Sequence, residues 1–360
     1  MISSPNSTCR PRVDERMTIA PDQTLMFAEA AEAGAVVARQ AMVQRDARAA
    51  LIEALRRDPP RLVATLARGS SDNAATVARY LIETHLCLLT SSAAPSVASV
   101  YDAAPDYDDV LMLAISQSGR SPDLIAAAEM AKSHGARLVA LVNDDDAPLA
   151  ATADFFLPLA AGAERSVAAT KSFVASVAAL LYLIAEWSDD EALVATLADL
   201  PMQLDAAWAL DWSAALEPLR TASNLYVVAR GPAFGIAQEM ALKIKETCGF
   251  HAEAFSAAEV RHGPMAIVQQ GFHVLLLGQD DESRDSVADL APDFAARGAI
   301  VLHAGIGDAP GLRLPSLDAH PAIQPLLLVQ SFYRLANAVA VARGRDPDRP
   351  PFLAKVTETV

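Results

Sequence analysis

Short apolar runs alternate along this chain with longer stretches in which apolar residues recur at helical spacing. Runs that end in loops rich in Gly, Ser, Asn and Asp are typical of buried strands, and the Ala-rich stretches between them are typical of helices. Strands are predicted at 61–66, 110–115, 137–142, 154–157, 225–229 and 273–278. Such alternation indicates an α/β fold in which a parallel sheet is wrapped by helices on both faces, that is, doubly wound.

The predicted helices fill the intervals between these strands. Two helices are expected between Thr24 and Arg57, one reaches about His85, one reaches about His134, and a long Ala-rich helix follows Ser166. A final amphipathic helix is expected at 326–342. The segment 1–22 lacks any periodic apolar pattern, so it is predicted to form a flexible tail.

The second half of the sequence repeats the first. Arg68-Gly69 after one strand is matched by Arg230-Gly231 after another, and the strand that ends at Ser116 is matched by one that ends at Gly278. The interval from 68 to 230 equals the interval from 116 to 278, which indicates an internal repeat. Two tandem α/β subdomains are therefore predicted, at 23–195 and 196–342, followed by a tail at 343–360.

The strand at 110–115 ends in the loop Ser116-Gln-Ser-Gly-Arg-Ser121, and Pro122 opens the next helix. Such a loop directs backbone N–H groups and a helix dipole at one point, and its serines add hydroxyl donors. It predicts an anion site, such as one for phosphate, although a serine-rich turn with an N-cap fits the same residues. In the second repeat the loop is Gly278-Gln-Asp-Asp-Glu-Ser283, whose carboxylates would repel phosphate. The anion site is therefore assigned to the first repeat.

Composition narrows the possible ligands and locations. The 360 residues are 52% hydrophobic and carry a net charge of -15, which argues against nucleic acid or an anionic membrane as partner but permits a small phosphorylated ligand. Three cysteines without C-x-x-C spacing favour a reducing cytoplasm. The apolar stretch 167–187 contains Lys171 and Glu186, so it is interpreted as a buried helix.

Two groups of residues have the types needed for acid–base chemistry. Glu239, Lys243 and Glu246 form a stripe on one helix, although a solvated face with an ordinary Glu–Lys pair has the same spacing. Histidine is the residue type suited to shuttling a proton near neutral pH, which makes His262 a candidate, although a structural histidine beside Gly-Pro is the plainer interpretation. No metal-binding spacing is present. Ser166 is expected to cap the long helix, and Lys355 is by default a solvated lysine.

Five ordered motifs together resemble the sugar isomerase (SIS) domain family, and most closely the isomerase half of glucosamine-6-phosphate synthases. They are ARGSSDNA at 67, SQSGRS at 116, ERSVAATKSF at 164, the run from IAQEMALKIKE to EVRHGP, and LAKVT near the end. The likeness covers 24–360. It implies two flavodoxin-like three-layer SIS subdomains, no metal or organic cofactor, and a homodimer.

The resemblance also implies roles for individual residues. Phosphate and sugar-hydroxyl contacts are expected from Ser70, Ser71, Ser116, Gln117, Ser118 and Ser121, and backbone contacts from Val167 and Ala354. Glu246 matches the base that moves a proton between C1 and C2 of the sugar. Lys243 matches the partner of this base, and Glu239 matches a further glutamate that the family has near the substrate. His262 matches a ring-opening residue supplied by the neighbouring subunit, and Lys355 matches the lysine of a tail that covers the site.

The sequence differs from the synthases in two respects. No N-terminal glutaminase domain is recognised, and Arg120 stands where the synthases have glutamate, which places a cation beside the predicted phosphate loop. Stand-alone members of this layout resemble glucosamine-6-phosphate deaminases, which release ammonia and form fructose 6-phosphate. The alternatives are a fructosamine-6-phosphate deglycase and a non-catalytic sensor of phosphosugars.

Overall fold

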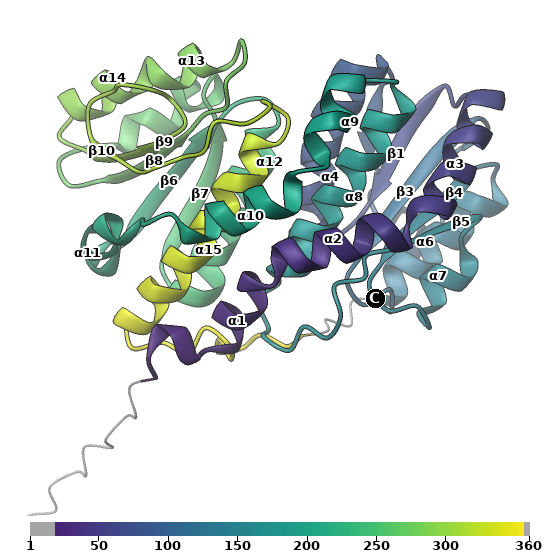
Figure 1. Cartoon of the computed structure of the whole chain (residues 1–360), viewed down its shortest axis with the longest axis horizontal. Coiled ribbons are helices and arrows are strands. Elements are labelled where there is room, and N and C mark those ends of the chain that lie inside the picture. The colour runs from purple at the N-terminus through teal and green to yellow at the C-terminus, as the bar shows by residue number, and fades with distance from the viewer. Residues whose placement is uncertain (1–18, 356–360) are drawn as a thin grey trace, which may run out of the picture.

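The computed structural model describes residues 19–355 of the chain. Two five-stranded parallel sheets form its framework (Figure 1). The first sheet has the order β2-β1-β3-β4-β5 and the second the equivalent order β7-β6-β8-β9-β10. The strands are β1 (Leu62–Leu66), β2 (Thr90–Ser92), β3 (Val110–Ser116), β4 (Arg137–Val142), β5 (Phe155–Pro158), β6 (Asn224–Ala229), β7 (His251–Ser256), β8 (His273–Leu277), β9 (Ile300–Ala304) and β10 (Leu312–Arg313). The predicted α/β class and its two tandem parallel-sheet units are confirmed.

Helices cover both faces of each sheet. They are α1 (Leu25–Ala31), α2 (Ala33–Val43), α3 (Arg45–Arg57), α4 (Ser70–Leu81), α5 (Ser96–Ser99), α6 (Pro122–Ser133), α7 (Pro148–Thr152), α8 (Lys171–Trp187), α9 (Glu191–Leu197), α10 (Leu200–Ala209), α11 (Leu216–Thr221), α12 (Ala233–Lys243), α13 (Arg284–Ala288), α14 (Leu290–Ala296) and α15 (Gln324–Ala342). The short helices are η1 (Pro21–Gln23), η2 (Ile82–Leu86), η3 (Ser213–Ala215), η4 (Ile244–Cys248), η5 (Glu259–His262) and η6 (Pro264–Ile267).

The internal repeat extends to a helical irregularity. The helix after β1 and the helix after β6 each end in a π turn, η2 and η4, and the starts of these turns are separated by the same interval as the repeated motifs. Each turn is closed by a residue in the left-handed conformation, Cys87 with φ 54° and Gly249 with φ 64°. The predicted offset therefore holds for backbone geometry as well as for sequence.

Alternation along the strands distributes side chains between separate cores. In β1, Val63 packs into a large core that also contains α4, α8, α12 and α15, whereas Ala64 and Leu66 pack toward α6 on the other face. A third cluster lies beneath α13 and α14 on the outer face of the second sheet. Each subdomain thus has three layers, and the large core joins the two.

Several predicted boundaries need correction. The N-terminal tail is predicted to reach Asp22, yet Pro21 begins η1 and its carbonyl accepts a hydrogen bond from Asn337 Nδ2 at 2.7 Å; residues 1–18 lie outside the described part. Three helices, not two, occupy 25–57, because breaks occur at 32 and 44. Ser166 does not cap the long helix, whose N-cap is Thr170. Strands β2, β7, β9 and β10 are not predicted from the sequence.

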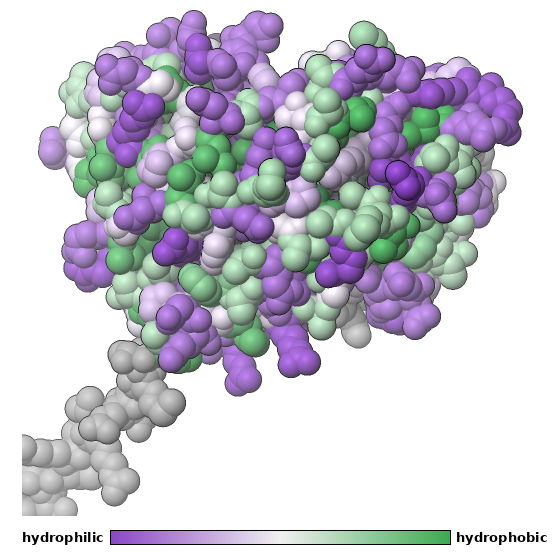
Figure 2. All heavy atoms as spheres, in the orientation of Figure 1, coloured by the Kyte–Doolittle hydropathy of each residue, from purple (hydrophilic) through white to green (hydrophobic). Residues whose placement is uncertain are grey.

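On the face drawn in Figure 2, hydrophilic side chains are spread over both lobes, and a notch separates the lobes at the top of the view. Within 19–355, α15 alone has the length and apolar character of a membrane span, and 78% of its apolar window is buried. A buried helix is predicted at 167–187, and α8 is buried almost throughout but begins only at Lys171.

Candidate active site

A cavity of about 320 Å³ lies at the carboxyl ends of β1 and β3. The connections from these two neighbouring strands run in opposite directions, which is where open α/β sheets of this strand order bind ligands. Loops of the first repeat, α12 with its π turn, and the C-terminal segment all contribute to it. The lining residues are 68–71, 115–118 and 353–355 together with Ser121, Leu124, Val167, Ala169, Lys243 and Glu246.

The loop between β3 and α6 is a tight turn around Gly119. Gly119 has φ 60°, and a Cβ at this position would lie 2.6 Å from Val142 Cγ1 and 2.7 Å from Ala147 Cβ. The Gly119 amide donates to Ser116 Oγ at 3.0 Å, and Ser121 occupies the N-cap of α6. The predicted strand, loop and helix are therefore present, and only glycine fits the centre of the turn.

The equivalent loop of the second repeat holds a carboxylate of its own. Asp281 accepts hydrogen bonds from the Ser283 amide at 2.8 Å, from the Ser283 hydroxyl at 2.6 Å and from Gln279 Nε2 at 2.8 Å. Ser283 is also the N-cap position of α13. A loop of this construction thus holds an anionic group at the start of its helix.

The first repeat has the matching donors without that carboxylate. At the constant offset between the repeats, Gln117 and Ser121 correspond to Gln279 and Ser283, whereas Gly119 takes the place of Asp281. The first loop therefore has no carboxylate of its own that would compete with an external anion for these donors. This asymmetry supports the assignment of the anion site to the first repeat.

Arg120, the predicted cation beside this loop, is paired at the surface. Its Nε and Nη2 donate to Asp144 Oδ2 at 3.0 and 2.7 Å, and these bonds lower the pKa of the Asp144 carboxyl. Arg120 is not among the residues that line the cavity. The charge of Arg120 is therefore balanced by that of Asp144.

Helix α12 and its π turn place three charged side chains together. Lys243 Nζ lies 3.4 Å from Glu239 Oε1 and donates to Glu246 Oε2. The side chains of Glu239 and Lys243 are 0% and 1% exposed, whereas that of Glu246 is 22% exposed. The interpretation of this stripe as a solvated helix face is wrong. Glu246, in the π turn, is the member of the group that remains open to the cavity.

Glu239 lies behind the cavity and joins three helices. Its carboxylate accepts hydrogen bonds from Ser70 Oγ at 3.2 Å and Asn73 Nδ2 at 2.9 Å on α4, and from the Tyr333 hydroxyl at 3.2 Å on α15. Buried carboxylates need such partners. Glu239 therefore reaches the cavity through Ser70 and Lys243, which line it.

Burial and charge shift the pKa values in this cluster. Burial raises the pKa of Glu239, and the positive charge of Lys243 offsets this only in part. Burial would lower the pKa of Lys243, but the negative charges of Glu239 and Glu246 outweigh it and hold the pKa above its ordinary value. Lys243 is therefore a cation near neutral pH. Burial and the adjacent Glu239 also raise the pKa of Tyr333, which stays protonated.

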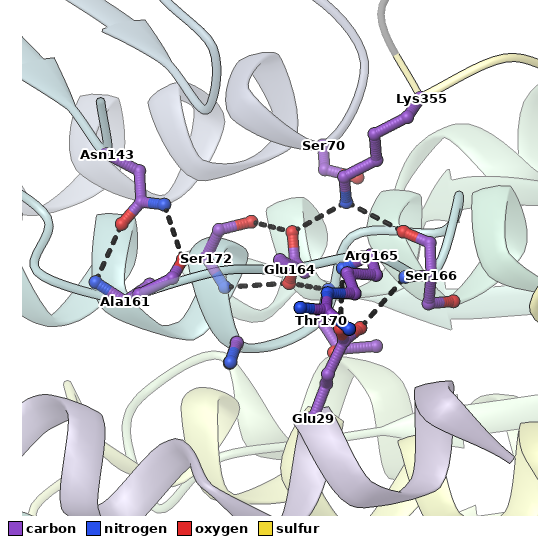
Figure 3. Close-up of polar contacts among 12 residues, drawn as sticks. Glu29, Ser70, Asn143, Ala161, Glu164, Arg165, Ser166, Thr170, Ser172 and Lys355 are labelled. Atoms are coloured by element: carbon purple, nitrogen blue, oxygen red, sulfur yellow. Dashed lines mark hydrogen bonds and ion pairs between the residues drawn. The ribbon is translucent and has the colours of Figure 1, made fainter. Parts of the chain in front are cut away.

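The C-terminal segment is fastened to the cavity by Lys355 (Figure 3). Lys355 Nζ donates to Glu164 Oε2 at 2.9 Å and to the Ser166 carbonyl at 2.8 Å. The Glu164 side chain is 0% exposed and also accepts the Thr170 amide at 3.0 Å and the Ser172 hydroxyl at 2.7 Å. Lys355 is thus bound within the structure and is not a solvated surface lysine.

A second buried carboxylate braces the same loop from the other side. Glu29 on α1 accepts the amides of Arg165 at 2.5 Å and Ser166 at 3.1 Å (Figure 3). The next amide, that of Val167, donates to the Asp348 carbonyl at 3.2 Å, and the Asp348 carboxylate caps the start of α1. The loop that carries Val167 to the cavity is therefore held between α1 and the C-terminal segment.

Replacing Glu164 by glutamine is expected to destabilise the fold by about 1–3 kcal/mol at neutral pH, because a buried charged acceptor is lost. Burial alone would raise the pKa of Glu164, but Lys355 and the hydrogen bonds outweigh it and lower the pKa. This contribution to stability is present above the ordinary glutamate pKa of 4.5 and disappears as the pH falls through the lowered pKa. Urea unfolding of wild type and E164Q at neutral and acidic pH tests this prediction.

The expected result is a difference in the free energy of unfolding between wild type and E164Q that becomes smaller at acidic pH. The exposed Glu53 supplies the matched control, and E53Q is expected to follow wild type at every pH. If this difference in the free energy of unfolding stayed constant from neutral to acidic pH, it would not come from the charge of Glu164.

A family model described as the SIS domain matches residues 59–186 and 218–313, more than half of the chain. The chain belongs to the SIS domain family. The matched segments contain both parallel sheets of the SIS protein, and the linking helices α9 and α10 lie between them.

The SIS protein is also similar to named relatives. The isomerizing glutamine–fructose-6-phosphate aminotransferase of Symbiobacterium thermophilum is 33% identical over 335 residues, which cover 85% of this chain and 52% of the relative. The chain thus spans about half the length of the curated relatives it matches. A solved structure from Silicibacter pomeroyi DSS-3, of a protein proposed to be a phosphosugar isomerase, has 41% identity and a TM-score of 0.87, over 90% of this chain and 100% of that one.

A third similarity concerns the fold alone. The C-terminal domain of a glucosamine-fructose-6-phosphate aminotransferase from Francisella tularensis has 24% identity and a TM-score of 0.80, over 91% of this chain and 98% of that domain. The tandem arrangement of two SIS subdomains is therefore shared with a solved structure.

Most of the side chains predicted for the SIS site are brought to one cavity. The predicted residues that line it are Ser70, Ser71, Ser116, Gln117, Ser118, Ser121, Val167, Lys243, Glu246, Ala354 and Lys355. Glu239 lies behind them. His262 is exposed in η5 and does not line the cavity, so its role through a neighbouring subunit stays a prediction.

Three side chains stand out among those at this site that sequence reasoning missed. Arg68 lines the cavity, Glu164 receives Lys355, and Tyr333 donates to Glu239. Arg68 and Glu164 stand inside recognised motifs, so a motif-wide search would have included them. Tyr333 lies in an ordinary amphipathic helix and carried no signal.

Proposed function

We propose that this SIS protein is a phosphosugar isomerase that binds a hexose 6-phosphate. One observation carries the proposal: the hydroxyl-rich loops of the first repeat and the Lys243–Glu246 pair of the second repeat line one cavity of about 320 Å³. An anion cradle and a carboxylate within one small cavity suit a substrate that has a phosphate at one end and a reacting carbon at the other.

The finer proposal concerns the substrate, glucosamine 6-phosphate, and its conversion to fructose 6-phosphate and ammonia. The curated relatives are named for fructose 6-phosphate and for transfer of an amine, which supports this pair of sugars. Release of ammonia is the direction that we propose.

In this proposal Glu246 takes the proton from C2 of the open-chain sugar while the C1 oxygen is protonated. The resulting enolamine regains a proton at C1 and loses one from nitrogen, which leaves a ketimine at C2. One water adds to C2, ammonia leaves, and fructose 6-phosphate remains. The Lys243 cation beside Glu246 stabilises the negative charge that develops on oxygen.

The position of the C-terminal segment supports the same proposal. Lys355 ties this segment to the loop that carries Val167, so the segment covers one side of the cavity and limits access of water. We further propose a homodimer in which His262 of one chain assists ring opening in the neighbouring chain.

Measurement of ammonia and fructose 6-phosphate from glucosamine 6-phosphate tests the function. Equal amounts of both products are expected, and fructosamine 6-phosphates are expected to turn over more slowly. Faster turnover of the fructosamine phosphates would instead assign a deglycase. Binding of hexose 6-phosphates without turnover of any would overturn the enzyme and favour a phosphosugar sensor.

A further inference from the structure

The cavity has a shortage of positive charge for the ligand that it is proposed to bind. Among the residues that the structure describes, Arg68, Lys243 and Lys355 are the cationic side chains that line it. Lys243 lies against both carboxylates of its helix, and Lys355 is held by Glu164. A phosphate monoester near neutral pH carries close to two negative charges, so serine hydroxyls and backbone amides alone would leave most of its charge uncompensated.

Arg68 stands at the junction of the two loops that form the cradle. It lies in the loop after β1 and precedes Ser70 and Ser71. Its guanidinium is bound to the first turn of α6, the helix that follows the serine loop. Arg68 Nε and Nη2 donate to the same oxygen, Asp123 Oδ2, at 3.0 and 2.6 Å. The guanidinium is thus fixed to both halves of the cradle.

The partner carboxylate is buried while the arginine is not. The Asp123 side chain is 1% exposed, and its other oxygen accepts the Leu124 amide at 2.9 Å. The Arg68 side chain is 52% exposed and lines the cavity. Among the described residues no hydrogen bond is made by Arg68 Nη1. Asp123 therefore orients the guanidinium and leaves one of its nitrogens available to a ligand in the cavity.

We propose that Arg68 is a direct ligand of the substrate phosphate and that Asp123 is the residue that positions it. Arg68 then selects dianionic phosphate esters over uncharged hexoses and over singly charged anions. Arginine suits this task because its planar guanidinium stays charged and makes directed hydrogen bonds to phosphate oxygens. The inference rests on the proposed function, since it presumes that a phosphosugar enters this cavity.

Binding of glucitol 6-phosphate to the full chain, measured by titration calorimetry, tests the proposal. Loss of one charge-assisted interaction is expected to weaken the affinity of R68Q about 10- to 100-fold, and R68K is expected to fall between R68Q and wild type. The matched control is R79Q, because Arg79 is an exposed arginine on the neighbouring α4, and its affinity is expected to be unchanged.

Removal of Arg68 leaves the buried Asp123 without its cation, so a structural effect has to be separated from a direct one. The double variant R68Q/D123N removes both charges, and it is expected to regain wild-type thermal stability while its affinity stays as weak as that of R68Q. The pH profile gives a second readout. Wild-type affinity is expected to rise as the phosphate loses its second proton near pH 6, and this rise is expected to be smaller in R68Q.

Three results would overturn the proposal. The first is unchanged affinity of R68Q, the second is recovery of affinity in R68Q/D123N, and the third is an R68Q pH profile parallel to that of wild type. Failure of the wild-type protein to bind glucitol 6-phosphate at all would instead overturn the proposed function, so the two failures are distinguishable.

Discussion

Replacing Glu246 by glutamine is expected to lower turnover about 10²- to 10⁴-fold while the affinity for a sugar phosphate stays nearly unchanged. The substitution keeps the shape of the side chain and removes its ability to take a proton from carbon. Glu246 is the partly exposed member of the α12 cluster and lines the cavity, so its loss affects the reacting end of the substrate and not the phosphate cradle.

The measurement compares the initial rate of ammonia release with the calorimetric affinity for glucitol 6-phosphate. The matched control is E253Q, since Glu253 is an exposed glutamate on β7 that does not line the cavity. Equal loss of binding and turnover in E246Q would show that Glu246 holds the substrate or the fold, and full activity would exclude it as the base.

Features that depend on neighbouring residues in the chain were predictable. The strand, glycine turn and helix around 110–122 are specified by an apolar run, a compact Ser–Gly loop and a proline, all of which act locally. The two sheets followed from repeated motifs at one constant offset, and that offset holds even for the π turns. Local chemistry and an internal repeat therefore predicted most of the fold.

Features that depend on residues far apart in the chain were not predictable from the sequence. Spacing alone could not decide whether the stripe at 239, 243 and 246 faces water, because burial is decided by α4 and α15 packing over α12. The end of the N-terminal tail was misplaced because Pro21 is held by Asn337, which is 316 residues away. Glu164 stands in a recognised motif, but its role as the partner of Lys355 depends on a residue 191 positions away.

The loop at 278–283 in the second repeat shows both what the sequence predicts and what it does not. The sequence correctly indicated that its carboxylates disfavour phosphate, because charge can be read directly. It could not indicate that Asp281 turns inward and occupies the donors of its own loop. Asp281 stands at the position equivalent to Gly119, so the second loop is filled by a carboxylate of its own and the first loop is not.

Replacing Lys243 by methionine is expected to destabilise the SIS protein by about 3–5 kcal/mol, because it leaves Glu239 buried without its cation. Burial already raises the pKa of Glu239 above the ordinary value of 4.5, and loss of Lys243 raises this pKa further. The folded state of K243M then binds a proton that the unfolded state has released, so stability falls as the pH rises from 4.5 through the raised pKa.

The double variant K243M/E239Q separates this effect from the chemistry. Glutamine at 239 retains an oxygen for the Tyr333 hydroxyl and removes the buried charge, so the double variant is expected to recover most of the lost stability and to lose the new dependence on pH. Both K243M and the double variant are expected to show no turnover, because each lacks the Lys243 cation beside Glu246. Urea unfolding from pH 5 to pH 8, together with the ammonia assay, tests both parts. A K243M variant as stable as wild type at pH 8 would contradict the assignment of Lys243 as the counter-charge of Glu239, and an active double variant would remove Lys243 from the reaction.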